Sequence, residues 1–110
     1  MTLREKLETE IIDFLQVFDY KLLYDDCKDG KLPYPLATDI FSAALILMEL
    51  RGKMDKYEYQ ILGSVTGCLL EHDEETCKIN HFRIRACLAY VDSLVNPPKK
   101  VNCSTSMMYI

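Results

Sequence analysis

Two cysteines and both histidines of the chain fall within the stretch GCLLEHDEETCKINH at positions 67–81. Cys68 and Cys77 each stand four residues before a histidine, His72 and His81 respectively. Thiolate and imidazole groups are preferred ligands of tetrahedral Zn²⁺, and residues four apart share one face of a helix. If two helices meet here as an antiparallel hairpin, the four side chains lie on facing stripes. One interpretation is therefore a zinc site, and the other is an ordinary packed corner.

The packed corner is the simpler of these two interpretations. Zinc modules mostly place their cysteines two to four residues apart in a turn, which is not the spacing here. Unpaired cysteine is also common in protein cores. The acidic residues between the two pairs match neither an EF-hand nor a di-iron bundle, and they suit the start of a helix. We therefore expect no cofactor, with zinc as the single alternative.

The sequence gives little support for a catalytic site. Cys77 and His72 could act as nucleophile and base, but nothing in the sequence supplies oxyanion donors or a cleft. The sequence also lacks a phosphate-binding glycine loop and a dinucleotide fingerprint. We therefore expect a protein without catalytic activity.

Composition is typical of one small globular domain. Of its 110 residues, 49% are hydrophobic and 27% are charged, which is enough to build a core. A net charge of -4 argues against nucleic-acid binding. The sequence contains no membrane-spanning apolar run, and the segment MTLREKLETE does not resemble a secretory signal. The 5 cysteines, an odd number, then predict reduced thiols and a cytoplasmic location.

Helical periodicity appears four times along the chain. The first helix begins at Thr2, where Thr2 and Glu5 form a capping box, its apolar stripe covers residues 3–22, and Gly30 ends it. The alternative is a bend or fraying after Tyr20, because the acidic residues at 25 and 26 are unfavourable at a helix C-terminus. The second helix covers residues 38–51, is apolar on nearly all sides, and ends at Gly52. So apolar a helix is hard to bury in a small domain without a partner chain.

The last two helices carry the Cys/His corner. The third begins with a capping box from Asp55 to Glu58, and the fourth covers residues 75–95. The fourth helix has two apolar strips on opposite sides. The main strip contains Ile84, Leu88, Val91 and Val95, and the second strip contains Ile79, Phe82, Ala86 and Tyr90.

Short connections between the last three helices imply antiparallel neighbours. We therefore predict an all-α protein of a single domain. An up-and-down four-helix bundle is expected over residues 1–96, followed by an extended or disordered C-terminal tail over residues 97–110.

Surplus apolar surface predicts contact between copies of the chain. Two apolar strips on one helix exceed what a small bundle buries. Gly63 and Gly67 share a further face, where the missing side chains permit close approach of a helix from a partner or from within the domain. We expect a homodimer with an interface that includes Gly63, Gly67, Ile79, Phe82 and Tyr90.

The functional prediction follows from this surplus surface. We expect a small cytosolic interaction or regulatory module that self-associates and contacts a further, unidentified protein partner. The alternative is a zinc-binding bundle or sensor that uses the Cys/His corner. Neither nucleic acid nor a membrane is expected as a partner.

Overall fold

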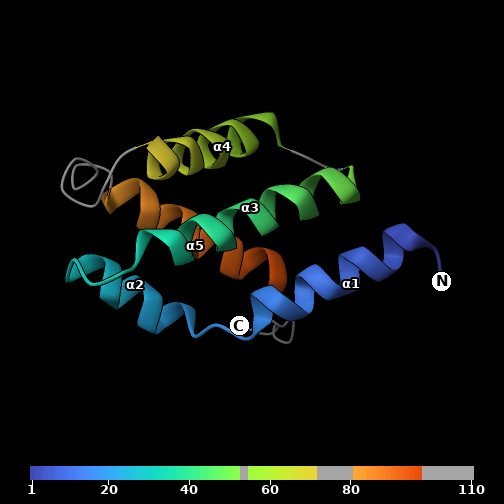
Figure 1. Cartoon of the computed structure of the whole chain (residues 1–110), viewed down its shortest axis with the longest axis horizontal. Coiled ribbons are helices and arrows are strands. Elements are labelled where there is room, and N and C mark those ends of the chain that lie inside the picture. Colours follow the sequence, from blue (N-terminus) through green and yellow to red (C-terminus); the bar gives the residue numbers. More distant parts are fainter. Residues whose placement is uncertain (53–54, 72–80, 98–110) are drawn as a thin grey trace, which may run out of the picture.

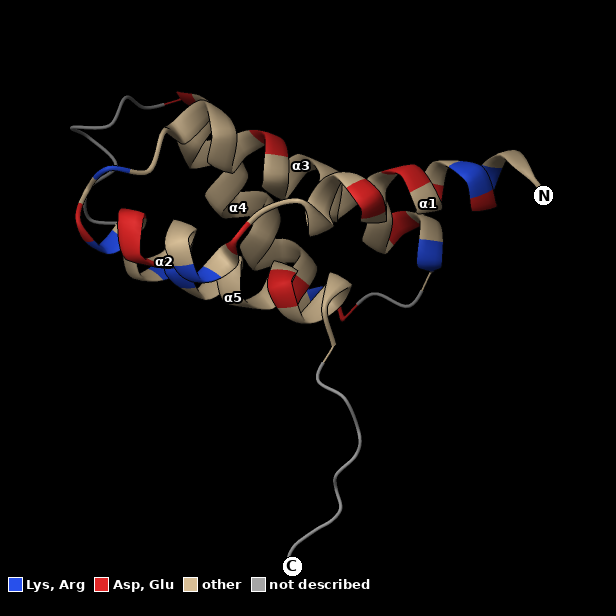
Figure 2. Ribbon diagram, turned by 90° about the horizontal axis from the view of Figure 1, so that it is seen from below, with Lys and Arg blue, Asp and Glu red and all other residues tan. Residues whose placement is uncertain are grey.

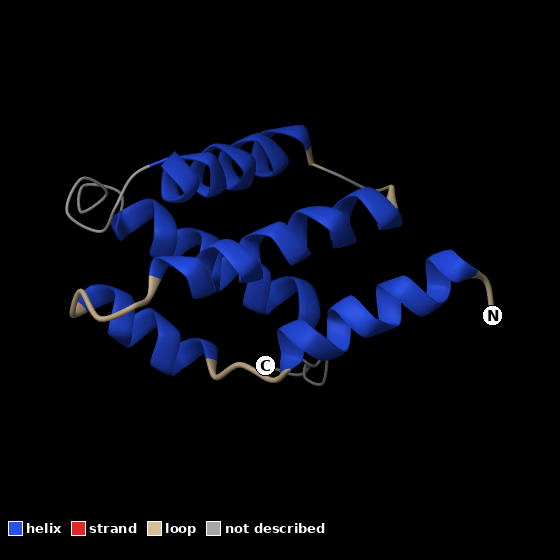
Figure 3. Cartoon of the chain, in the orientation of Figure 1, coloured by secondary structure: helices blue, strands red, loops and turns tan. Residues whose placement is uncertain are grey.

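Five α-helices make up the described part of the chain in a computed structural model, which describes residues 1–52, 55–71 and 81–97 (Figure 1, Figure 3). They are α1 (Leu3–Gln16), α2 (Tyr20–Lys28), α3 (Tyr34–Arg51), α4 (Lys56–Glu71) and α5 (His81–Val95). These described ranges contain no β-strand, which confirms the all-α class. Of the described helices, none is both long and apolar enough to cross a membrane.

The first predicted helix is in fact two helices, so the prediction of one helix from Thr2 to Gly30 is wrong, and the break lies before Tyr20, where the alternative placed a bend after it. α1 ends at Gln16, and α2 begins after Asp19. The Asp19 carboxylate accepts a hydrogen bond from the backbone N–H of Leu22 at 3.1 Å and so caps α2. In the sequence, the apolar spacing continues through Phe18 to Leu22, so periodicity alone did not reveal the break. In the structure, Leu22 is 55% exposed, and α2 instead buries Tyr20, Leu23 and Cys27.

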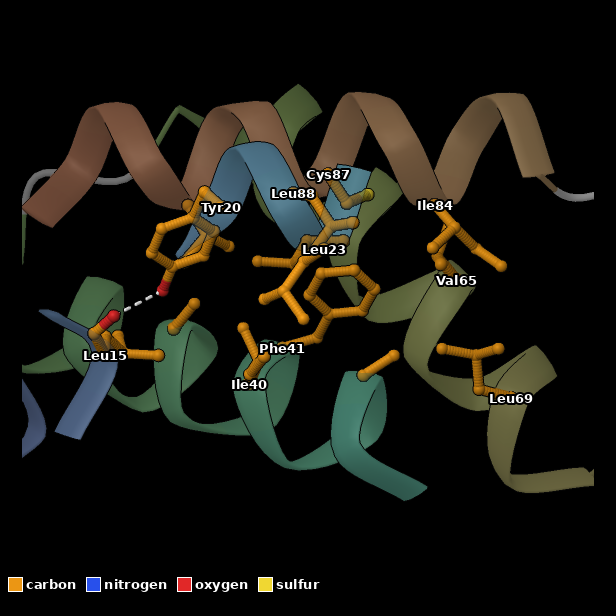
Figure 4. Packing of buried hydrophobic residues seen from close by; sticks show 14 of the residues in the cluster. Leu15, Tyr20, Leu23, Ile40, Phe41, Val65, Leu69, Ile84, Cys87 and Leu88 are labelled. Carbon is orange, nitrogen blue, oxygen red and sulfur yellow. Dashed lines mark hydrogen bonds between the residues drawn. The ribbon is translucent and has the colours of Figure 1, made fainter. Parts of the chain in front are cut away.

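Tyr20 connects α1 to α2 through the core. Its ring is buried, and its hydroxyl donates a hydrogen bond to the backbone carbonyl of Leu15 at 2.6 Å (Figure 4). That carbonyl lies in the last turn of α1, where carbonyls lack a helical donor. Between the helices, the Phe18 ring packs edge-on against Phe14 and Tyr20, with centroid distances of 5.3 and 6.5 Å. Contacts from both helices, with Leu15 and Tyr20 buried, therefore hold the turn.

Most other helix ends lie where the capping residues and glycines of the sequence predict them. The backbone N–H of Thr2 donates to the Glu5 carboxylate at 3.0 Å, and that of Glu5 donates to the Thr2 hydroxyl at 3.1 Å, which confirms the capping box. Gly30 and Gly52 have φ angles of 74° and 67°, as expected of glycines that end helices. The Asp55 carboxylate accepts two backbone hydrogen bonds in the first turn of α4, at 2.9 and 3.2 Å.

α3 begins at Tyr34, earlier than the predicted start at Thr38. Pro33 is its N-cap residue, and Pro35 lies in its first turn. The first amides of a helix have no helical acceptor, so a proline without an N–H is tolerated there. The two prolines therefore belong to the start of this helix.

α3 lies at the centre of the fold. It packs most extensively against α4 and also against α1 and α5, while α2 packs against α5 (Figure 1). The expectation that α3 requires a partner chain is therefore corrected, because the chain's own helices bury Ile40, Phe41 and Leu47 completely. Ile46 is the large apolar side chain of α3 that stays outside, with 46% of its surface exposed.

One hydrophobic cluster joins all five helices (Figure 4). The main predicted strip of α5 belongs to it, since Ile84, Leu88, Val91 and Val95 are all buried. The predicted start of this helix, at Glu75, lies outside the described residues. So do residues 98–110 of the predicted tail. With five helices, of which α3 is the central one, the described residues do not confirm the up-and-down four-helix bundle.

The apolar stripe of α1 is only half used in this core. Figure 1 and Figure 2 both show the N-terminal end of α1 extending away from the other helices. Leu15 is buried and Ile11 is partly buried, whereas Leu3, Leu7 and Phe14 are exposed. The C-terminal half of α1 therefore anchors this helix to the fold.

Candidate functional site

The structure describes half of the proposed Cys/His corner. Cys68 is half-buried in the last turns of α4, and His81 is the half-buried first residue of α5. His72 and Cys77 lie outside the described residues, so the four-residue zinc site stays a prediction. Within the described ranges, no three His, Cys, Asp or Glu side chains come together in a way that could hold a metal ion.

A third cysteine, Cys27, lies beside His81 and was not predicted from the sequence. The Cys27 thiol, near the end of α2, donates a weak hydrogen bond to the backbone carbonyl of His81 at 3.9 Å. Burial raises the pKa of this thiol, and the nearby Arg85 guanidinium partly offsets that effect. A thiol held protonated is a poor metal ligand. Cys27 therefore acts as a packing residue between α2 and α5.

Gly63 and Gly67 lie on an open face of α4. A Cβ atom added at either position would meet no atom of the described structure within 4 Å, apart from its own helical turn. No described helix therefore approaches closely at these glycines. Tight packing within the domain, one of the two interpretations from sequence, is wrong for the described residues. Contact with a second chain stays a prediction.

A half-open apolar groove runs between α4 and α5. Its volume is about 190 Å³. It is lined by Tyr57, Glu58, Ile61 and Leu62 from α4 and by Ala86, Cys87 and Tyr90 from α5. The side chains of Leu62 and Cys87 are buried, whereas Tyr57 is exposed. The groove exists because α4 packs chiefly against α3 and less extensively against α5.

The polar groups of the groove are neutral apart from its carboxylate edge. Burial raises the pKa of Tyr90 to about 12. The Glu58 carboxylate, which accepts a hydrogen bond from the Tyr90 hydroxyl, adds to this increase, and so do the negative charges of Glu58 and Asp55. Burial also raises the pKa of the Cys87 thiol to about 11. At neutral pH the groove is thus an apolar hollow with negative charge along one edge.

Phe82 is exposed beside this groove, on the same helix. Its side chain is 78% exposed, and it precedes Ala86 by one helical turn. The Arg85 guanidinium carbon lies 4.7 Å from the centroid of the Phe82 ring and 5.6 Å from that of Tyr24. The Arg85 Nε atom is buried, and no group of the described structure accepts a hydrogen bond from it. Phe82 is therefore an aromatic side chain that is exposed to solvent and stacked against Arg85.

The predicted interface residues divide between two faces. Phe82 and Tyr90 lie at or beside the groove, Gly63 and Gly67 lie on the open face of α4, and Ile79 is outside the described residues. The α4 side of the groove was not predicted from the sequence, because the displacement of α4 from α5 depends on tertiary packing.

Comparison of the chain with protein-family models, with curated proteins and with solved structures gave no match. The fold and the groove define a small all-α protein with an apolar, acid-edged hollow. Its function must therefore be inferred from these residues.

Proposed function

We propose that this protein is a small, non-catalytic interaction module that self-associates as a homodimer. The observation that carries the proposal is the half-open apolar groove between α4 and α5 with the exposed Phe82 beside it. An apolar pocket next to an exposed aromatic side chain is what the centre of a protein–protein contact requires.

The chemistry of the groove favours binding over catalysis. Its thiol, Cys87, has a pKa raised to about 11 and is therefore protonated at neutral pH, which makes it a weak nucleophile. The Tyr90 hydroxyl, with a pKa raised to about 12, is likewise unable to act as a base near neutrality. The remaining lining is mostly apolar, which suits the burial of a partner's side chain.

We further propose a cytoplasmic location for the dimer. Cys27 and Cys87 are unpaired buried thiols, and a reducing compartment keeps such thiols in that form. Self-association does not preclude a further protein partner on another face, such as the open face at Gly63 and Gly67.

Sedimentation equilibrium of the wild-type chain tests this function directly. Over low to high micromolar concentrations, we expect the average mass to rise from that of a monomer to twice that value. A constant monomer mass over the whole range would rule out self-association. The same runs with a zinc chelator present distinguish a dimer held by protein contacts from one held by metal.

A further inference from the structure

We propose that Phe82 of each copy occupies the α4–α5 groove of the other copy, in a two-fold symmetric contact between the two α5 helices. This inference rests on the proposed self-association and names the residues that perform it. In such an isologous dimer both grooves are filled by the same residue, so the assembly is closed at two chains.

The size of the groove matches one aromatic side chain. Its volume of about 190 Å³ is somewhat larger than an apolar cavity of roughly 150 Å³ that accepts benzene in another protein. It is smaller than the roughly 300 Å³ or more of pockets that enclose drug-sized ligands. A phenyl ring is therefore a better fit than a larger ligand.

The spacing along α5 permits the exchange. Ala86 and Tyr90, which line the groove, follow Phe82 by one and two helical turns. If two antiparallel α5 helices cross near Ala86, each Phe82 lies level with the partner's groove. Ala86 and Ala89 are exposed and small, so they permit close approach of the two helices at the crossing.

The charges beside the two surfaces are complementary. Arg83 follows Phe82 and is exposed, whereas the groove has carboxylates near its edge at Glu58 and Asp55. Docking of Phe82 brings Arg83 towards the partner's Glu58. If acidic residues flanked Phe82 instead, they would face like charges at this edge of the groove, and the contact would be disfavoured.

The Phe82 side chain is also restricted in motion before it binds. The Arg85 guanidinium lies over one face of the Phe82 ring, at 4.7 Å from its centroid, and restricts its motion. Less side-chain entropy is then lost when the ring is buried against a partner. The geometry of the free chain thus favours insertion of this ring.

Sedimentation equilibrium of variants tests the contact. We expect Phe82→Ala to raise the dimer dissociation constant on the order of 100-fold or more, because each dimer contains this buried aromatic anchor twice. Val17→Ala is the matched control, since Val17 is an exposed apolar residue, at 74%, between α1 and α2. This control is expected to dimerise like the wild type. Unchanged circular dichroism shows that Phe82→Ala still folds, as expected for so exposed a side chain.

A charge exchange tests the proposed partner of Arg83. Arg83→Glu and Glu58→Lys are each expected to weaken the dimer, and the double variant is expected to recover most of the lost affinity. A surface residue that merely supports the fold would show no such recovery.

The outcomes separate this contact from the proposed function. A wild-type chain that stays monomeric overturns both. A wild-type dimer whose dissociation constant is the same in Phe82→Ala overturns this contact and leaves self-association in place. In that case, loss of the dimer in Gly67→Leu would assign the contact to the open face of α4.

Discussion

At the scale of single residues, Tyr20 has the most clearly defined role in the fold. Its buried hydroxyl donates a hydrogen bond to the carbonyl of Leu15, which links the end of α1 to the start of α2. Burial raises the pKa of Tyr20 to about 12, and the charge of the Asp92 carboxylate adds to this effect. The neutral hydroxyl is thus favoured in the folded state.

Tyr20→Phe is expected to lower the free energy of unfolding at neutral pH by about 1 kcal/mol, because a buried hydrogen bond is lost and the shape is kept. The folded-state pKa, about 12, exceeds the ordinary value of 10.0. The stabilisation from Tyr20 is therefore complete below pH 10 and disappears as pH rises through 12. Urea unfolding of both proteins should show the difference shrinking at alkaline pH. A constant difference would contradict this linkage.

Cys87 provides a chemical probe of the groove. Its pKa is raised from an ordinary 9.0 to about 11 by burial. We expect the rate of its alkylation by iodoacetamide to keep rising with pH up to about 11, since only the thiolate reacts. Mass spectrometry of the Cys87 peptide measures this rate. In urea-unfolded protein, the alkylation rate of the same cysteine should level off near the ordinary pKa of the thiol. Identical dependences of the rate on pH in folded and unfolded protein would refute a buried thiol.

At the scale of elements, local signals predicted helix ends better than helix continuity. The Thr2–Glu5 capping box and the terminal glycines act within one turn, so the sequence alone reveals them. The break before α2 was missed because the apolar period continues on both sides of it. The choice between a cap at Asp19 and a longer helix depends on whether Tyr20 can be buried, which is a tertiary matter.

Gly63→Ala is expected to raise the free energy of unfolding by about 1 kcal/mol. Alanine is the better helix former, and the added Cβ meets no described atom outside its own turn. Urea unfolding at dilute concentration measures the change. Gly30→Ala is the matched control, because its φ of 74° is strained for alanine, and it should destabilise the protein. A destabilised Gly63→Ala variant would show that another group packs against this face.

At the scale of the whole molecule, the arrangement of helices decides what surface is left for a partner. The apolar excess of α3 suggested a dimer, yet α1, α4 and α5 cover that helix within one chain. The residues left for contact come instead from α5, whose second strip was visible in the sequence, and from α4. The groove between them could not be predicted, because it depends on how far α4 is displaced from α5 when it packs on α3.

The most direct test of the central claim is an isotope-filtered NMR experiment on a mixture of labelled and unlabelled chains. Such a spectrum reports only contacts between two copies. We predict intermolecular nuclear Overhauser effects between the ring protons of Phe82 and the methyl groups of Ile61, Leu62 and Ala86, which line the groove. A dimeric sample with no such effects, or with effects confined to the face of Gly63 and Gly67, would contradict the account.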